Sequence, residues 1–154
     1  MNKILVTGGS GFIGSHTCFY LLSEGYDIYV LDSLVNSSLE VLDKINKINN
    51  LVKIETKGNF FFREGDLRDT KWLDGLFNEF EEKGIPIDSV IHFAGLKSVS
   101  ESAVNPIEYW DVNVGSSISL FSVMEKHSCF KIVFSSSATI YKPNQFKKLM
   151  KNLY

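Results

Sequence analysis

The chain has few cysteines, no excess of positive charge and no long hydrophobic run. Its two cysteines, Cys18 and Cys129, have neither metal-ligand nor redox spacing, so we expect free buried thiols and no metal site. The 154 residues include 16 Lys and Arg against 18 Asp and Glu, and the net charge of −2 disfavours nucleic acid as a partner. No apolar segment approaches the ~20 residues that span a bilayer, and the N-terminus has no signal-peptide pattern. We therefore expect a cytoplasmic protein without a membrane partner.

Hydrophobic residues make up 44% of the chain and charged residues 22%, which is typical of a globular domain. Five short apolar segments are predicted to be strands: residues 3–7, 27–32, 60–64, 89–93 and 131–135. Between them, the sequence predicts helices at residues 12–24, 39–48 and 71–83, and a longer one from 105 or 106 to about 127. Parallel strands need a crossover between them, so this alternation predicts an α/β fold with a doubly wound parallel sheet.

Two of these helices have recognisable starts. Asp69 or Thr70 is a candidate cap for the helix at residues 71–83, and Asn105 followed by Pro106 is typical of a helix start. The long helix carries one apolar stripe, formed by Ile107, Trp110, Val114, Ile118, Phe121 and Met124. The polar segment at residues 46–59 is predicted to be a surface loop.

A glycine motif follows the first predicted strand. Gly8, Gly11 and Gly14 have the spacing G-x-x-G-x-x-G and lie between a strand and a helix. In such a loop the first glycine permits a tight turn, the second lets the backbone approach a pyrophosphate, and the third lets the helix pack close to the sheet. The amides at the helix N-terminus then face the phosphate charge. An ordinary glycine-rich turn is the alternative, but the position of the motif favours dinucleotide binding by a Rossmann-type fold.

Acidic and small residues follow the other strands. Asp32 ends the second strand, 18 residues after Gly14, where a carboxylate accepts hydrogen bonds from adenosine ribose hydroxyls and repels a 2′-phosphate. This predicts NAD rather than NADP as the cofactor. Asp66 follows the third strand and is placed to reach an adenine, although a turn aspartate is equally compatible with it. Phe93, Ala94 and Gly95 follow the fourth strand and form either a ligand approach or a simple turn.

Six segments carry a resemblance to a known family. They are VTGGSGFIGSHT (residues 6–17), LDSLVNSS (31–38), EGDLRD (64–69), IHFAGLKSVSES (91–102), NPIEYWDVNV (105–114) and FSSSATIY (134–141). They occur in the order of the family and cover residues 3–141. On these segments the chain resembles the extended short-chain dehydrogenase/reductase family, and HFAGLK together with SSSAT is specific to its UDP-glucose 4-epimerases.

The resemblance implies roles for individual residues. The amides of Phe12 and Ile13 would contact the pyrophosphate. The residues implied to hold the rest of the cofactor are Asp32, Asn36 and Ser37 at the adenosine ribose and phosphate, Asp66 and Leu67 at the adenine, and Phe93, Ala94, Gly95 and Lys97 along its path. Ser137 matches the catalytic serine and would hydrogen-bond the sugar hydroxyl that is oxidised. On the residues alone, Ser137 is only part of a serine-rich strand end.

The chain departs from the family in two places. Many relatives have two asparagines after Tyr-Tyr-Asp, whereas here Asp111 is followed by Val112, which puts one cofactor bond in doubt. The Tyr-x-x-x-Lys motif, in which the tyrosine exchanges a proton with the sugar and the lysine lowers its pKa, is missing. Tyr141 belongs to the preceding stretch, and Gln145 lies four positions after it. His16 and His92 are expected to be structural.

The resemblance implies an enzyme that interconverts UDP-glucose and UDP-galactose through a 4-keto sugar, with tightly bound NAD, and full-length relatives that form homodimers. The chain itself is expected to be a partial, incomplete Rossmann domain of about five strands at residues 1–141, with a divergent or truncated tail at 142–154 and no substrate domain. On that expectation the 154-residue chain alone does not turn over its substrate. The alternatives are another nucleotide-sugar dehydratase or decarboxylase of the family, or an inactive NAD-binding fragment.

Overall fold

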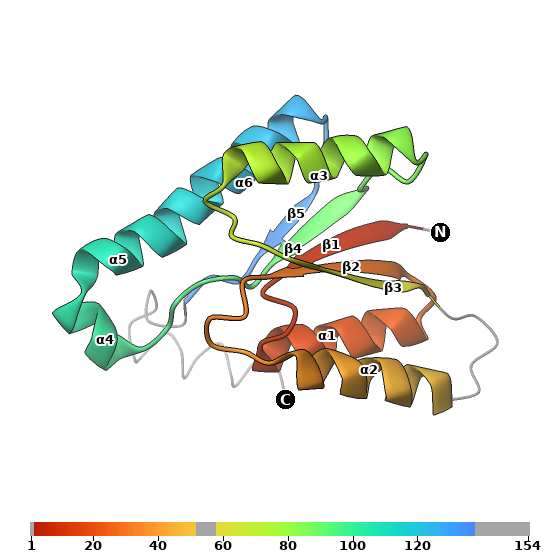
Figure 1. The fold of residues 1–154 in the computed structure, drawn as a ribbon, viewed down its shortest axis with the longest axis horizontal. Coiled ribbons are helices and arrows are strands. Elements are labelled where there is room, and N and C mark those ends of the chain that lie inside the picture. Colours follow the sequence, from red (N-terminus) through yellow and green to blue (C-terminus); the bar gives the residue numbers. More distant parts are fainter. Residues whose placement is uncertain (1, 52–57, 138–154) are drawn as a thin grey trace, which may run out of the picture.

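One parallel sheet forms the centre of the protein (Figure 1). The computed structural model describes residues 2–51 and 58–137, and within them five strands have the order β3-β2-β1-β4-β5. The strands are β1 Lys3–Thr7, β2 Asp27–Asp32, β3 Phe60–Glu64, β4 Ser89–His92 and β5 Ile132–Phe134. Every pairing between neighbours is parallel, which confirms the predicted α/β fold. Compared with the prediction, β4 is one residue shorter and β5 lacks one residue at each end.

Two layers of helices cover the two faces of the sheet (Figure 1). The helices on one face are α1 Phe12–Ser23 and α2 Leu39–Leu51, and those on the other are α3 Thr70–Glu82 and α6 Ser116–Lys126. Successive side chains of β1 point to opposite layers. Leu5 packs with the buried residues of α3 and α6, whereas Ile4 and Val6 pack with those of α1 and α2. This two-sided burial explains why β1 is apolar throughout its central residues.

Helix α2 is longer than the sequence pattern predicts. After its buried residue Ile45 the helix continues to Leu51, so the loop predicted from Asn46 onward is wrong in its first part. The reason is that residues 46–50 are mostly polar, and a polar helix end has the same composition as a loop. Residues 52–57 of that predicted loop lie outside the described residues, as do Tyr141 and the predicted tail.

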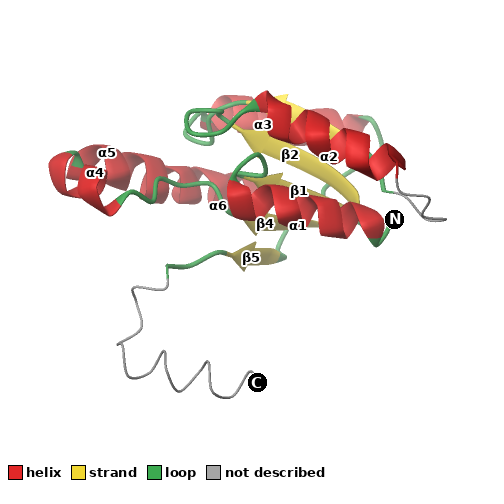
Figure 2. Ribbon diagram, turned by 90° about the horizontal axis from the view of Figure 1, so that it is seen from below, coloured by secondary structure: helices red, strands yellow, loops and turns green. Residues whose placement is uncertain are grey.

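The predicted long helix forms in three consecutive segments. α5 Pro106–Trp110 runs into a π-helical turn, η1 Asp111–Gly115, and then into α6. Most of the predicted apolar stripe lies on the surface: Ile107 is 79% exposed, and Met124 is the buried member. The buried face of α6 consists instead of Ser116, Ser117, Ser119, Leu120, Val123 and Met124. Figure 2 shows that α5 extends beyond the sheet, and its apolar side chains Ile107 and Trp110 are exposed.

A short helix, α4 Val99–Val104, precedes α5 and is not predicted by the sequence pattern. Its first turn is capped by Ser98, whose Oγ accepts from the Glu101 amide at 3.4 Å. None of its residues is buried, so it has no apolar periodicity to detect. No helix in the described part of the chain is long and apolar enough to cross a membrane.

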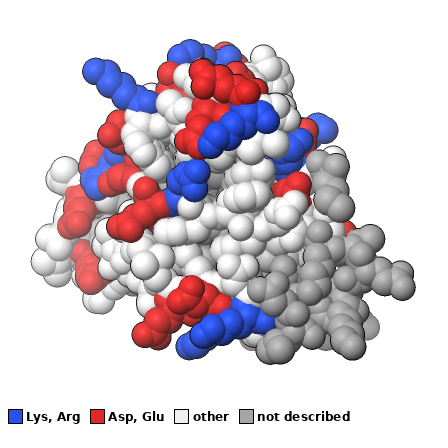
Figure 3. Space-filling view, turned by 45° about the vertical axis from the view of Figure 1, so that its right-hand side comes forward, with Lys and Arg blue, Asp and Glu red and all other residues white. Residues whose placement is uncertain are grey.

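Charged side chains connect the outer helices. Figure 3 shows acidic and basic side chains interspersed on one side of the molecule, with uncharged side chains between them. Lys126 lies 2.7 Å from Asp74, and the imidazole of His127 lies 3.0 Å from Asp74 and 2.8 Å from Glu81. These contacts join the C-terminal end of α6 to α3, beside the buried Phe77 of α3. They therefore add polar contacts to two helices that the buried core already holds together.

Removal of the cap of α3 is expected to weaken the fold without changing its core. The Asp69 carboxylate accepts from the Trp72 amide at 3.0 Å, which satisfies one of the helix's unpaired N–H groups. Asp69→Ala should lower the free energy of unfolding by about 1 kcal/mol. Urea unfolding followed by circular dichroism measures this, with Asp43→Ala on the exposed side of α2 as the control. Equal stabilities of the two variants would contradict the capping role.

Candidate functional site

The carboxyl ends of the strands bring the predicted site residues to one edge of the sheet. β1 leads into the glycine motif, and its neighbour β4 leads into residues 93–97. The strand order changes direction here, because β2 and β3 lie on one side of β1 and β4 and β5 lie on the other. In open α/β sheets, ligands bind outside the carboxyl ends of the strands at such a point.

A cavity with two lobes lies at this edge. The smaller lobe, of about 170 Å³, lies toward β2 and β3, and the larger, of about 520 Å³, lies toward β5. Both are lined by Gly8, Gly11 and residues 93–97. The smaller lobe also holds the predicted residues Asp32, Asn36, Asp66 and Leu67. The larger holds Phe12, Ile13, Gly14 and Ser137. The predicted residues therefore line two adjoining lobes that share Gly8, Gly11 and residues 93–97, except Ser37, which donates a hydrogen bond to Asp32.

The three glycines of the motif meet different steric constraints. Gly8 has a φ of +69°, and a β-carbon there would lie 2.6 Å from the Ala94 nitrogen. A β-carbon on Gly14 would lie 2.3 Å from the Gly8 carbonyl oxygen. On Gly11, by contrast, the nearest heavy atom to an added β-carbon is the Gly8 oxygen at 3.3 Å. Gly8 and Gly14 are thus required by the fold, whereas Gly11 leaves space on the side of the cavity.

The N-terminus of α1 opens onto the larger lobe. The first N–H groups of a helix have no acceptor within it, and the N-cap residue Gly11 has no side chain to satisfy them. The residues that follow, Phe12 and Ile13, are 76% and 57% exposed. Their position between the glycine motif and the cavity matches an anion site formed by backbone amides and the positive end of the helix dipole.

The carboxylate of Asp32 is buried and held in a fixed orientation. Its Oδ2 accepts from the Ser10 amide at 3.1 Å, and its Oδ1 accepts from the Leu34 amide at 2.9 Å and the Ser37 hydroxyl at 3.0 Å. A second bond, 2.8 Å between the hydroxyls of Ser10 and Ser37, joins the glycine motif to the loop after β2. Because a carboxylate has about four acceptor positions, one remains for a ligand hydroxyl.

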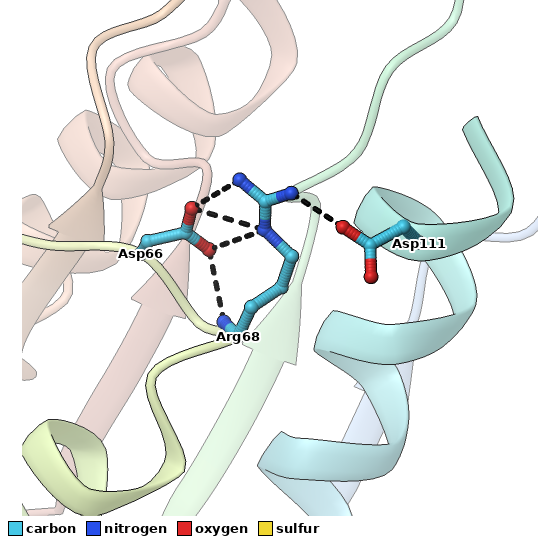
Figure 4. Close-up of polar contacts among 3 residues, drawn as sticks. All are labelled: Asp66, Arg68 and Asp111. Atoms are coloured by element: carbon cyan, nitrogen blue, oxygen red, sulfur yellow. Dashed lines mark hydrogen bonds and ion pairs between the residues drawn. The ribbon is translucent and has the colours of Figure 1, made fainter. Parts of the chain in front are cut away.

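The other acidic residue of the smaller lobe, Asp66, is paired with Arg68 (Figure 4). The Arg68 side chain also reaches Asp111 of η1, with an Nη1 to Oδ2 distance of 2.6 Å. Hydrogen bonds from the Arg68 guanidinium lower the pKa of the Asp66 carboxyl, so this group is ionised. The lobe lined by Asp32 and Asp66 therefore contains one compensated carboxylate and one that faces the cavity without a cation bonded to it among the described residues.

His92 connects β1, β4 and the π-helical turn through a directed chain of hydrogen bonds. The Ser117 hydroxyl donates to the Asn113 carbonyl at 2.6 Å, so it accepts from His92 Nε2 at 3.3 Å. His92 Nδ1 is then an acceptor for the Thr7 hydroxyl at 2.6 Å, and Thr7 in turn accepts from the Ala94 amide. Burial lowers the pKa of His92, and the neutral imidazole is the form that this chain needs.

Asn113 holds the loop after β4. Its Oδ1 accepts from the Leu96 amide at 2.7 Å, and its Nδ2 donates to the Leu96 carbonyl at 2.9 Å. Two residues further on, the Ser98 amide donates to the Tyr109 hydroxyl, which donates to Glu101. The backbone around Lys97, which lines both lobes, is therefore fixed by side chains of the helices that follow it.

Several of these residues have no signal in the sequence. Ser10 lies inside the glycine motif and Thr7 directly before it, but their side-chain bonds depend on partners 27 and 85 positions away. Asn113 and Arg68 act across 17 and 43 positions. Val112 lines the smaller lobe, whereas the neighbouring Asn113 binds the backbone of Leu96. Ser137 lies at the exposed edge of the larger lobe.

Comparison with known proteins adds a family. The family model described as GDP-mannose 4,6 dehydratase matches residues 5–147. The chain is 48% identical over 143 residues to the UDP-glucose 4-epimerase of Cyamopsis tetragonoloba, which covers 92% of this chain and 38% of that protein. It is 49% identical over 138 residues to the UDP-glucose 4-epimerase of Bacillus subtilis (strain 168), covering 90% and 37%.

A solved structure agrees with these relatives. The UDP-glucose 4-epimerase from Bifidobacterium longum, in complex with NAD+ and UDP, superposes with a TM-score of 0.79 at 44% identity. The match covers 91% of this chain and 38% of that one. The chain thus spans less than two fifths of the length of each of these relatives.

Alanine substitutions at Gly14 and Gly11 are expected to lower the free energy of unfolding by different amounts, because of these two positions the fold requires a glycine only at 14. Gly14→Ala places a β-carbon against backbone atoms and should lower the free energy of unfolding by about 1–3 kcal/mol, as overpacking does. Gly11→Ala should lower it by less, about 1 kcal/mol or below, because its β-carbon meets a single atom, the Gly8 carbonyl oxygen at 3.3 Å, which need shift by only a few tenths of an ångström. Chemical denaturation of both variants measures the difference. Similar losses for both would contradict the steric assignment.

The neutral state of His92 predicts a pH dependence of stability. The pKa of the folded imidazole lies below its ordinary value of 6.5, so the unfolded chain binds this proton first as the pH falls. The unfolding free energy should fall below pH 6.5 and level off once the folded pKa is passed. His92→Gln should remove this component, while His16 and His127 contribute equally to both proteins. If both proteins lose stability in parallel between pH 7 and 5, as read from denaturation curves at matched salt, the assignment fails.

Proposed function

The chain belongs to the GDP-mannose 4,6-dehydratase family, and on that premise we propose that it is the NAD-binding part of a UDP-glucose 4-epimerase. One observation carries the proposal: an anchored, buried carboxylate lines one lobe, an uncapped helix N-terminus lines the adjoining one, and Gly8 and Gly11 of the glycine loop line both. The identity of 48% to a UDP-glucose 4-epimerase supports the choice of reaction.

The residues present fit a dinucleotide diphosphate. The diphosphate would lie at the start of α1, where the amides of Phe12 and Ile13 supply donors and the helix dipole favours negative charge. Gly11 permits this approach, since its missing β-carbon leaves the side of the cavity open. A helix N-terminus with a side-chain cap would have to release that cap before it could bind a phosphate.

Asp32 would select NAD over NADP. Its Oδ2 accepts one hydrogen bond, from the Ser10 amide. The remaining acceptor position of the carboxylate is available to the ribose hydroxyls of adenosine. Ser37 fixes the other oxygen, and Asn36 lines the same lobe. A 2′-phosphate would meet a buried negative charge in a region of low dielectric constant, where like charges repel strongly.

The remaining predicted residues would place the two ends of the cofactor. Asp66 and Leu67 would contact the adenine in the smaller lobe, and residues 93–95 with Lys97 would lead toward the larger lobe. When bound there, NAD accepts and returns the hydride, and the protein supplies orientation and charge. Ser137, at the edge of the larger lobe, would hydrogen-bond the sugar hydroxyl at the carbon that is oxidised.

UDP-glucose and UDP-galactose are the proposed substrates of the complete enzyme. Epimerisation also needs a group that takes and returns the hydroxyl proton, and no tyrosine of this sequence has a lysine four residues after it. We infer that this group and most of the sugar pocket come from the portion of the relatives that the chain does not span. Dehydration is the competing chemistry, because the family model is named after a dehydratase, but the relatives near 48% identity are epimerases.

Cofactor preference tests the proposal. Calorimetric titration of the 154-residue chain should give an affinity for NAD at least about tenfold higher than for NADP, the size of one charge-assisted contact. Asp32→Ala should weaken NAD and bring the two affinities together. The matched control is Asp27→Ala, at the N-terminal end of the same strand and away from the cavity. This variant should keep the preference for NAD over NADP. Equal affinities in the unmutated chain would overturn the role of Asp32.

A further inference from the structure

Arg68 joins two carboxylates from distant parts of the chain at the smaller lobe (Figure 4). Toward Asp66, its backbone amide donates to Oδ1 at 2.9 Å, its Nε lies 3.1 Å and 3.0 Å from the two oxygens, and its Nη2 donates to Oδ2 at 2.6 Å. Toward Asp111, its Nη1 donates to Oδ2 at 2.6 Å. The guanidinium thus uses opposite sides for the two partners.

The fold itself gains little from this arrangement. The side chains of Arg68, Asp66 and Asp111 are 41%, 43% and 60% exposed. Ion pairs at such exposure contribute little to stability, since water screens them and the side chains lose freedom. Core packing of α3 and α6, rather than this pair, holds the two segments on the same face of the sheet. A role at the cavity is the better explanation of so many directed bonds.

The bonds determine which way Asp66 presents its carboxylate. Three N–H groups of Arg68 occupy most of the roughly four acceptor positions of the carboxylate. What remains is a single acceptor direction, and the planar fork of the guanidinium keeps the carboxylate from rotating. The second anchor, Asp111 on η1, keeps the guanidinium itself in place. An unanchored Asp66 would sample several orientations.

We propose that Arg68 is a positioning residue that gives the smaller lobe selectivity for a purine with a 6-amino group over one with a 6-oxo group. The inference rests on the proposed function, in which Asp66 contacts the adenine. A fixed carboxylate accepts from an amino group and repels an oxo group at the same place, because both would then be acceptors. A rotating carboxylate makes this distinction poorly.

The test compares NAD with nicotinamide hypoxanthine dinucleotide, which carries a 6-oxo base. Calorimetry on the unmutated 154-residue chain should show about tenfold tighter binding of NAD. Arg68→Lys keeps the charge but loses the fork and should reduce this ratio at least about threefold, and Asp111→Asn should reduce it in the same direction. Arg63→Lys is the matched control. Arg63 also pairs with a carboxylate, that of Glu79 at a distance of 3.2 Å, but it lines neither lobe.

Three results would overturn the inference. If neither Arg68→Lys nor Asp111→Asn changes the ratio of the two affinities, Asp66 needs no anchor. An equal loss for both dinucleotides would assign Arg68 a general charge effect, and a higher ratio would mean that Arg68 obstructs the base. Circular dichroism of each variant checks that it is folded, and the conservative Asp111→Asn supplies the answer if Arg68→Lys is not. If the unmutated chain binds neither dinucleotide, the proposed function fails, and the inference fails with it.

Discussion

The whole site depends on the close approach of backbone segments at the end of β1. Gly8 leaves the strand with a positive φ against the Ala94 backbone, and Gly14 packs against the Gly8 carbonyl. This contact lets α1 start directly after the strand end, so its uncapped first turn lines the larger lobe. The same loop carries Ser10, whose amide and hydroxyl orient Asp32 through direct and Ser37-mediated bonds. One steric constraint therefore sets both the proposed phosphate site and the proposed ribose site.

Local chemistry explains which features could be predicted from the sequence. The strands are continuous apolar runs because both faces of the sheet are covered. The glycine spacing indicates a strand–turn–helix connection because all three glycines act within that one turn. Asp69 caps α3 through a partner three residues away. The placement of Asp32 beside the smaller lobe could be predicted because it follows from the end of a strand. Each of these inferences depends only on residues that are close in the sequence, or on the order of strands that the crossover connections imply.

Features that depend on distant partners could not be predicted. The carboxylate that anchors Arg68 lies 43 positions away, and the hydroxyl on His92 Nδ1 lies 85 positions away. The stripe that includes Ile107 has helical spacing, yet α5 extends past the sheet that would cover it. α2 continues beyond Ile45 into a mostly polar segment, and the composition of such a segment does not distinguish a helix from a loop. In each case the tertiary arrangement, rather than a local pattern, decides the outcome. The roles proposed for the cofactor-binding residues, Asp32 among them, and for Ser137 stay predictions.

A crystal structure of the chain grown with NAD tests the central claim most directly. The account predicts a diphosphate on the amides of Phe12 and Ile13, and adenosine ribose hydroxyls within about 3.2 Å of the Asp32 carboxylate, with Ser10 and Ser37 still bonded to it. A dinucleotide bound outside the two lobes, or one with its diphosphate away from α1 and its ribose away from Asp32, would contradict it.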